Sequence, residues 1–300
     1  MQGLVLRAQS DFFWVQTELG VLVCKIRGKL KKERSTTDLV VIGDEVIVSP
    51  NMAGEGVIEQ VLNRRSRFSR RQPGKRNVGK EDVMIANLDR IVLVFAASNP
   101  PPSLRMLDRF LVIAEYNQVK PLIVMNKADL LAENQAEMLF GNYSQIGYEV
   151  LYVSTLNKIG IEALKTHLQT GISALTGPSG VGKSSLLNAL QPGLKLQVGD
   201  LRKEQTKGRH TTVVAELHPL IGTDGGYVAD TPGIREIATW DIPKTDLAWA
   251  FREFRPFLEQ CGFNDCSHIH EPNCAVRDAV AKKTISPERH ESYAILAKGS

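Results

Sequence analysis

The sequence lacks the long apolar runs of a membrane protein. No stretch approaches the roughly 18 consecutive apolar residues that a membrane-spanning helix needs. The N-terminus, MQGLVLRAQSDFFWV, has neither the charged start and apolar core nor the small-residue cleavage site of a signal peptide. We therefore expect a cytoplasmic protein. Its 300 residues, of which 43% are hydrophobic and 23% charged, are enough for two or three modest domains.

Cysteine is also scarce, with four in the chain, but three of them lie close together. Cys261, Cys266 and Cys274 enclose a histidine in the pattern C-x4-C-x-H-x5-C. In a cytosolic chain such clustering indicates a metal site rather than disulfides. Three thiolates and an imidazole complete the tetrahedral shell of a structural zinc ion and leave no position open for catalysis. We predict Cys261, Cys266, His268 and Cys274 as ligands of one Zn²⁺, with His270 as the alternative histidine.

Acidic side chains are absent from residues 62–80, LNRRSRFSRRQPGKRNVGK. A basic block of this kind repels itself and attracts polyanions. It is either a solvated linker or a contact for a nucleic-acid backbone. A second basic stretch at 25–34, KIRGKLKKER, favours the second interpretation.

The pattern of strands and helices divides the chain into four predicted parts. Residues 1–65 contain about five short β-segments without a helical period, which predicts a small β-barrel, and an OB-fold suits this pattern. Residues 66–85 form the basic linker. Residues 86–242 alternate continuous apolar strands with helices, as in a mostly parallel α/β sheet covered on both faces. Residues 243–300 are helix-rich and contain the predicted zinc site.

A phosphate loop occurs inside the α/β part, where GPSGVGKS at 177–184 matches G-x-x-x-x-G-K-[S/T]. Glycines permit a tight loop whose backbone N–H groups point at phosphate oxygens, and the start of the following helix adds positive potential. Lys183 would reach the β- and γ-phosphates, and Ser184 would ligate Mg²⁺. The motif residues are Gly177, Pro178, Ser179, Gly180, Val181, Gly182, Lys183 and Ser184.

A guanine clamp precedes this loop, in the N-K-x-D motif of Asn126, Lys127 and Asp129 after the apolar run PLIVM. Ligands bind at this end of strands in open α/β sheets. Asp129 can accept hydrogen bonds from N1–H and N2–H₂ of guanine, which adenine does not present. Asn126 would tie the clamp to the phosphate loop, and the Lys127 stem would lie along the base. Ser154 and Thr155, in VST at 153–155, resemble the second guanine-contacting loop.

Two further motifs follow the phosphate loop. In DTPG at 230–233, Asp230 would hold Mg²⁺ through water and the Gly233 N–H would sense the γ-phosphate. In GRHTT at 208–212, Thr212 is the expected magnesium-binding switch threonine, and Thr211 is the alternative.

Ile234 occupies the position after D-x-x-G where many GTPases carry a glutamine that orients the attacking water. His210 could orient this water, or it is a surface residue. Lys183, Thr212 and His210 are therefore the candidate catalytic residues. We expect slow intrinsic hydrolysis that a partner stimulates.

The motifs run in an unusual order, because the guanine clamp precedes the phosphate loop. Moving the clamp and the VST loop to the end restores the usual GTPase order. The sequence therefore predicts a circularly permuted P-loop GTPase, a rearrangement that domains tolerate because their termini commonly lie close together at the surface. Both switch segments then lie just before residues 245–300, and we expect nucleotide state to be transmitted to that region.

The motif order and the C-x4-C-x-H-x5-C pattern resemble the bacterial ribosome small-subunit-dependent GTPase A family over nearly the whole chain. The resemblance implies an OB-fold, a permuted GTPase and a zinc domain that bind the 30S subunit and its 16S rRNA late in assembly. It implies GTP hydrolysis, yielding GDP and phosphate, that the ribosome stimulates and that is coupled to release. It extends the phosphate loop to Ser185, matches the histidine beside the switch threonines at His210, and implies Zn²⁺ and Mg²⁺ as cofactors. We expect a monomer that does not bind membranes.

Three alternatives remain at this stage. The chain could be a non-ribosomal regulatory GTPase whose added domains bind protein, or an RNA-binding assembly scaffold in which hydrolysis is incidental. An ATPase is a more distant alternative, because Asp129 disfavours adenine.

Overall fold

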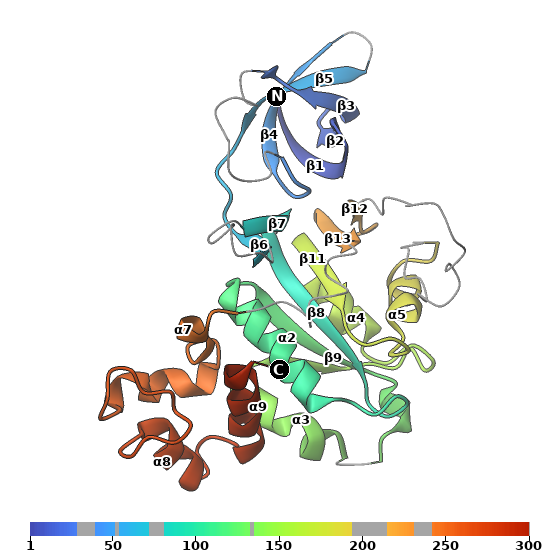
Figure 1. Cartoon of the computed structure of the whole chain (residues 1–300). Helices are drawn as coiled ribbons and strands as arrows, with labels where there is room; N and C mark the ends of the chain where they lie inside the picture. Colours follow the sequence, from blue (N-terminus) through green and yellow to red (C-terminus); the bar gives the residue numbers. More distant parts are fainter. Residues whose placement is uncertain are drawn as a thin grey trace, which may run out of the picture.

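The computed structural model describes residues 1–28, 40–51, 54–71, 81–132, 135–193, 215–230 and 242–299. An N-terminal barrel stands at one end of an α/β domain, and the C-terminal helices pack against the side of that domain (Figure 1). No described helix has both the length and the apolar character that crossing a membrane requires.

The N-terminal strands form a closed barrel. They are β1 (Gln2–Gln9), β2 (Phe12–Thr17), β3 (Gly20–Ile26), β4 (Glu45–Pro50) and β5 (Glu55–Val61). The pairs β1–β2, β2–β3, β4–β5 and β1–β4 are antiparallel, and β3–β5 is parallel. Alternate residues such as Val5, Val15 and Ile58 point inward and are fully buried. The predicted OB-like barrel is therefore confirmed.

The predicted linker at 66–85 differs in the structure, because both of its ends are strands. β6 (Arg67–Arg71) and β7 (Glu81–Ala86) form an antiparallel two-stranded sheet, while residues 72–80 lie outside the described part. Phe68, Val83 and Ile85 are buried, and their spacing at alternate positions favours a strand. The sequence analysis missed this sheet because the arginines around Phe68 masked the alternation.

Two arginines of the basic block already have carboxylate partners in the folded chain. Arg64 Nε lies 2.7 Å from Asp44 Oδ1 in a buried ion pair, and Arg65 Nη1 lies 2.8 Å from Asp89 Oδ1 at the surface. The Arg64 pair ties the end of the barrel to the loop before β4, and the Arg65 pair connects this segment to Asp89 in β8 of the α/β domain. The buried Arg64 is thus part of the fold, whereas the Arg65 side chain remains 61% exposed.

The α/β domain contains a mostly parallel sheet, as predicted. Its strands are β8 (Leu88–Ala96), β9 (Lys120–Asn126), β10 (Glu149–Tyr152), β11 (Gly171–Thr176), β12 (Glu216–Pro219) and β13 (Gly226–Asp230). Their order is β10-β9-β8-β11-β13-β12, and only the pairing of β12 with β13 is antiparallel among these described strands. β12 also pairs with β1 of the barrel, so the two sheets are continuous.

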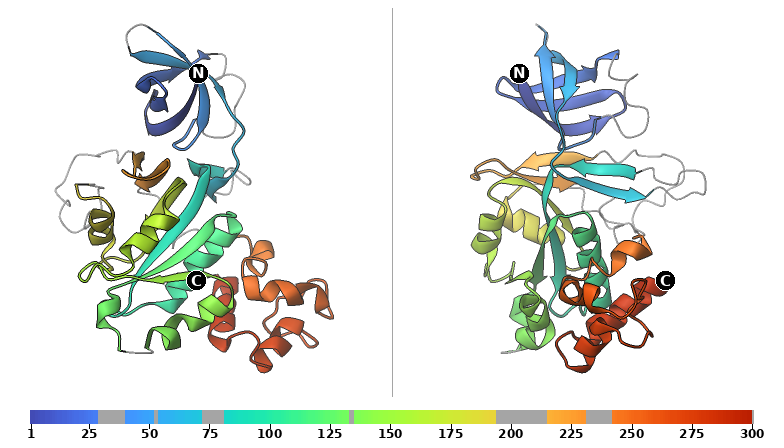
Figure 2. Two further views of the ribbon diagram at one scale, coloured as in Figure 1. Left: turned by 180° about the vertical axis from the view of Figure 1, so that it is seen from behind. Right: turned by 90° about the vertical axis from the view of Figure 1, so that its left-hand side faces the viewer.

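Helices cover both faces of this sheet (Figure 2). They are α2 (Leu104–Tyr116), α3 (Gln135–Gln145), α4 (Ile161–His167) and α5 (Lys183–Leu190). Successive residues of β8 point to opposite faces: Leu93 packs in the core shared with α2 and α3, while Val94 packs in the core shared with α4 and α5. The alternation of strands and helices predicted for residues 86–242 is therefore present.

The C-terminal region is helical, as predicted, and its described residues contain no strand. It comprises α7 (Lys244–Leu247), the 3-10 segment η3 (Arg252–Gln260), α8 (Ala275–Ala281) and α9 (Pro287–Lys298). Phe251, Phe254 and Tyr293 form its aromatic core, and Val112 of α2 joins the same core. This region therefore packs directly on a helix of the α/β domain.

Candidate functional site

The predicted phosphate loop connects β11 to α5. Gly177, Gly180 and Gly182 have φ angles of 147°, 80° and 93°, which residues with side chains rarely adopt. A Cβ on Gly177 would lie 2.0 Å from the carbonyl oxygen of Val94 in β8, so the loop passes too close to the sheet for any other residue. α5 begins directly after this loop, at Lys183. The loop and the start of α5 thus have the geometry that the binding of phosphate by backbone N–H groups requires.

Lys183 lies across the phosphate loop. Its ammonium group donates to the carbonyl oxygens of Gly177 and Pro178, each at 2.7 Å. Such a cation is in place to meet phosphate oxygens that enter the loop. Ser184 and Ser185 follow in the first turn of α5 and are exposed.

The N-K-x-D residues, predicted as the guanine clamp, lie beside this loop at the end of β9. Asn126 is 1% exposed, and its amide donates a 2.9 Å hydrogen bond to the carbonyl oxygen of Val181. Lys127 has a left-handed φ of 59°, and its ammonium group donates to the carbonyl oxygens of Gly180, at 2.9 Å, and Asn99. The tie between clamp and phosphate loop that the sequence analysis expects is therefore present.

Asp129 is held by the second loop. The buried hydroxyl of Ser154 donates a 2.5 Å hydrogen bond to Asp129 Oδ1 and accepts one of 3.0 Å from the Asn157 N–H. Thr155 follows in the same loop and is half-buried. These bonds orient an exposed carboxylate at the sheet edge where the phosphate loop also lies.

Asp230 lies at the end of β13, which runs parallel to β11. The carboxyl ends of parallel neighbours lie at the same edge, so Asp230 is on the side of the sheet that carries the phosphate loop. The predicted residues His210, Thr211, Thr212 and Gly233 lie outside the described residues.

The cysteine cluster forms in the C-terminal region. Sulfur atoms of Cys261, Cys266 and Cys274 and a ring nitrogen of His268 all lie within 4.8 Å of one another. His268 Nδ1 is 3.5 Å from Cys261 Sγ and 3.6 Å from Cys274 Sγ. His270, the alternative ligand, is exposed and lies outside this group. The structure thus brings together four donors that could hold a metal ion.

Four residues that the sequence did not predict support this cluster: Ser267, Glu271, His290 and Tyr293. Glu271 Oε1 accepts hydrogen bonds from Ser267 N at 3.0 Å and Ser267 Oγ at 2.6 Å. The Ser267 hydroxyl, with nearby backbone N–H groups, holds the pKa of Glu271 well below its usual range. From α9, Tyr293 donates to the Ser267 carbonyl oxygen at 2.7 Å, and a ring nitrogen of His290 lies 2.8 Å from the His268 carbonyl oxygen. No spacing rule marks His290 and Tyr293, because they come from a separate helix.

Two known families match the N-terminal barrel and the α/β domain. The family described as RsgA GTPase matches residues 61–240, and the one described as RsgA N-terminal domain matches residues 2–58. The chain belongs to the RsgA GTPase family. It is therefore a GTP-hydrolysing enzyme, and GTPases of this kind act with Mg²⁺.

Individual relatives align with this chain over nearly their full lengths. A protein of Gemmatimonas aurantiaca named small ribosomal subunit biogenesis GTPase RsgA is 45% identical over 297 residues, covering 98% of this chain and 95% of that protein. The crystal structure of YjeQ from Thermotoga maritima is 36% identical with a TM-score of 0.81, covering 99% of this chain and 97% of that one. YloQ, described as a circularly permuted GTPase, is 31% identical with a TM-score of 0.76, covering 99% and 93%. The permuted motif order is thus a feature of the RsgA fold.

Proposed function

We propose that this GTPase acts in biogenesis of the small ribosomal subunit, binds the 30S particle and its 16S rRNA late in maturation, and couples hydrolysis to its own release. Two hydrogen bonds support nucleotide binding: one joins Asn126 to Val181 and the other joins Lys127 to Gly180. They hold the base clamp against the phosphate loop, so that one nucleotide can contact both. The names of the relatives supply the small subunit as the setting.

The nucleotide would be bound at three points. Asp129 accepts from the guanine N–H groups, with Ser154 holding the carboxylate and Thr155 beside it. The loop from Gly177 to Ser185 surrounds the phosphates. Lys183 would exchange its two carbonyl partners for β- and γ-phosphate oxygens.

Magnesium would be held by the Ser184 hydroxyl, by a switch threonine and, through water, by Asp230. The switch threonine would be Thr212, or Thr211 as the alternative. The Gly233 N–H would contact the γ-phosphate. These roles are predictions from the sequence alone. The ion neutralises charge on the phosphates while Lys183 stabilises charge that develops during hydrolysis.

Hydrolysis needs a water molecule in line with the γ-phosphate. The position after D-x-x-G is Ile234, which cannot orient water, so His210 with the help of the ribosomal partner is the proposed orienting group. The lack of a glutamine at this position supports slow GTP hydrolysis by the protein alone and strong stimulation by the subunit.

The Cys₃His cluster would hold Zn²⁺ in a structural role. Three thiolates favour zinc over harder ions, and four protein ligands leave no open position for substrate. Metal analysis of the purified protein tests the identity of the ion.

RNA contact by the barrel has support on its outer surface. The Arg7 guanidinium lies 4.6 Å from the Trp14 ring centre, and the Lys25 ammonium lies 4.9 Å from that of Phe12. Basic groups interleaved with aromatic rings suit phosphate backbones and bases.

We include in the proposal that the protein acts as a monomer in the cytoplasm.

The deciding experiment measures GTP hydrolysis by the protein alone and with purified 30S subunits, with 50S subunits and ATP as controls. Stimulation by 30S alone, with no ATP hydrolysis, supports the proposal. Equal rates with and without 30S would contradict it and favour a non-ribosomal regulatory GTPase.

A further inference from the structure

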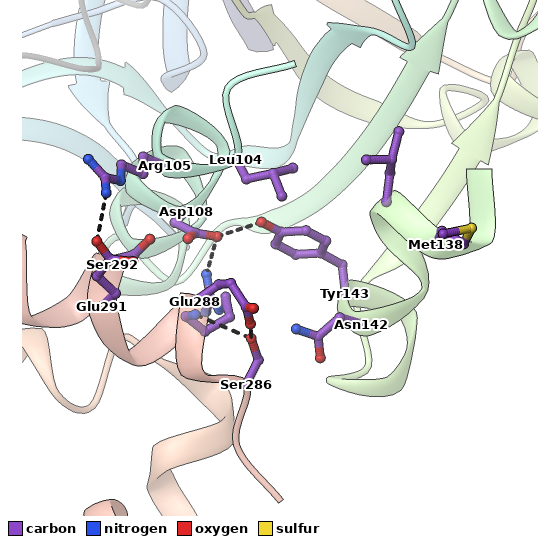
Figure 3. A pocket seen from close by; sticks show the side chains of 12 residues that line it. Leu104, Arg105, Asp108, Met138, Asn142, Tyr143, Ser286, Glu288, Glu291 and Ser292 are labelled. Atoms are coloured by element: carbon purple, nitrogen blue, oxygen red, sulfur yellow. Dashed lines mark hydrogen bonds and ion pairs between the residues drawn. The ribbon is translucent and has the colours of Figure 1, made fainter. Parts of the chain in front are cut away.

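A cavity of about 430 Å³ lies where the GTPase domain meets the C-terminal helices. α2 and α3 supply one side of it and α9 the other, so its lining comes from both domains (Figure 3). None of the predicted nucleotide or metal residues that the structure describes lines this cavity. Its volume is within the range of pockets that bind side chains or small molecules.

The floor of the cavity is a buried ion pair that links the two domains. Arg289 Nη1 of α9 donates to Asp108 Oδ1 of α2 at 2.7 Å, and the Tyr143 hydroxyl of α3 donates to the same oxygen at 2.7 Å. Arg289 also pairs with Glu253 at 2.6 Å. Because three helices are fixed by these bonds, the floor is formed before any partner arrives.

One wall of the cavity is apolar. It is lined by Met138 and Leu139 of α3 and by Leu104 at the start of α2. Met138 is 85% exposed, which is a high value for a large apolar side chain. An apolar side chain entering here would remove methionine surface from water, which stabilises binding.

The rim on α9 is acidic. Glu288 accepts a 2.6 Å hydrogen bond from the Ser286 hydroxyl and is exposed, and Glu291 forms an exposed ion pair of 2.7 Å with Arg105. Both arginines in the lining, Arg105 and Arg289, already have carboxylate partners. The negative rim repels a phosphate backbone and attracts a lysine or arginine.

We propose that this cavity binds a basic segment of a protein of the small ribosomal subunit. An apolar side chain of the segment packs on Met138, and a neighbouring lysine or arginine meets Glu288. The identity of the assembly rests on the proposed function, whereas the chemistry of the segment follows from the cavity. A segment bound here contacts α3 and α9 together, so it recognises the two domains only in their packed arrangement.

Two variants with matched controls test this docking site. Met138→Ser removes the apolar wall and Glu288→Gln removes rim charge while keeping an acceptor for Ser286. Ile221→Ser changes another apolar residue, 75% exposed, and Glu259→Gln another exposed glutamate, both outside the cavity. Affinity for 30S subunits is measured with a non-hydrolysable GTP analogue, beside hydrolysis without subunits and thermal unfolding.

We expect about a tenfold loss of 30S affinity for Met138→Ser, because a buried methionine contributes roughly that much, and about threefold for Glu288→Gln, comparable to one partly exposed charge pair. The controls should bind like wild type, and hydrolysis without subunits and thermal stability should be unchanged in all four variants. Cavity variants that bind 30S as well as wild type would overturn this proposal alone. Wild-type protein that does not bind 30S would overturn the proposed function and the docking site with it.

A photoreactive residue at position 138 identifies the occupant in the same complex. Crosslinks to a lysine- or arginine-containing peptide of a 30S protein support the proposal. Crosslinks to 16S rRNA, or to a second copy of this chain, would overturn it.

Discussion

The amide of Asn126 donates a 2.9 Å hydrogen bond to the carbonyl oxygen of Val181, across 55 positions of sequence. The base clamp and the phosphate loop are thus one structure, although the chain reaches the clamp first. Disturbing either partner should therefore weaken nucleotide binding as a whole.

Gly182→Ala should test this contact. A Cβ at position 182 would lie 2.3 Å from Asn126 Nδ2, so the clamp must move. We expect at least a tenfold weaker affinity for GTP, measured with a fluorescent analogue. Gly54→Ala is the matched control, since Gly54 also has a positive φ, of 75°, but has open space around it. Equal GTP affinity of the two variants would show that the contact is unimportant.

Asp129→Asn should change the base that is preferred. Asparagine offers an amide donor where guanine presents N2–H₂ donors, and xanthine presents a carbonyl there instead. We expect GTP affinity to fall by about a hundredfold, because leaving the guanine N–H donors without an acceptor costs about 1–3 kcal/mol once the base covers the site, while xanthosine triphosphate gains affinity. Competition binding with both nucleotides checks this, and unchanged selectivity would remove Asp129 from the base site.

Lys183→Ala should abolish most hydrolysis. The lysine is the cation at the phosphate loop, and removing one such group costs about 10²–10³ in turnover. Single-turnover hydrolysis with 30S subunits measures the loss. Equal binding to 30S and equal release from it, with and without GTP, in this variant would instead favour the RNA-binding scaffold.

Metal affinity should rise between about pH 6 and pH 8. Burial, together with the neighbouring thiols, raises the pKa of Cys266 to about 12 in the metal-free cluster. The thiol is then protonated at neutral pH, and a metal must displace that proton. Raising the pH lowers this competition. Titration against a chromogenic chelator at several pH values checks the direction, and a Cys274→Ser variant should lose the high-affinity ion.

Arg289→Met should destabilise the domain interface by about 3–5 kcal/mol, because it leaves buried carboxylates without their cation. The side chains of Arg289 and Asp108 are only 2% and 3% exposed. Arg105→Met is the control: its exposed pair with Glu291 should contribute less than about 1 kcal/mol. Urea unfolding of both variants measures the difference, and equal midpoints would contradict it.

Local patterns predicted the parts of the site that depend on backbone geometry. Gly177, Gly180 and Gly182 mark the phosphate loop because few other residues tolerate those φ angles. The β6–β7 sheet was missed because the segment between its inward residues, Phe68 and Val83, is rich in basic residues, a composition typical of a linker.

Sequence patterns could not predict contacts between residues that lie far apart in the chain. Arg289 and Asp108 meet across 181 positions, and nothing near either residue indicates its partner. The same holds for Tyr293, which supports the metal loop from α9. Such contacts depend on how whole helices pack.

The pairing of β1 with β12 has a further consequence for solubility. β12 is the last strand of the GTPase sheet, and its outer side would otherwise offer unpaired backbone donors and acceptors to another chain. Arg7 pairs with Glu216 there, and β1 belongs to a barrel that closes on itself. The N-terminal domain therefore covers part of this edge, and a chain without it should leave more of the β12 backbone open to pairing with another chain.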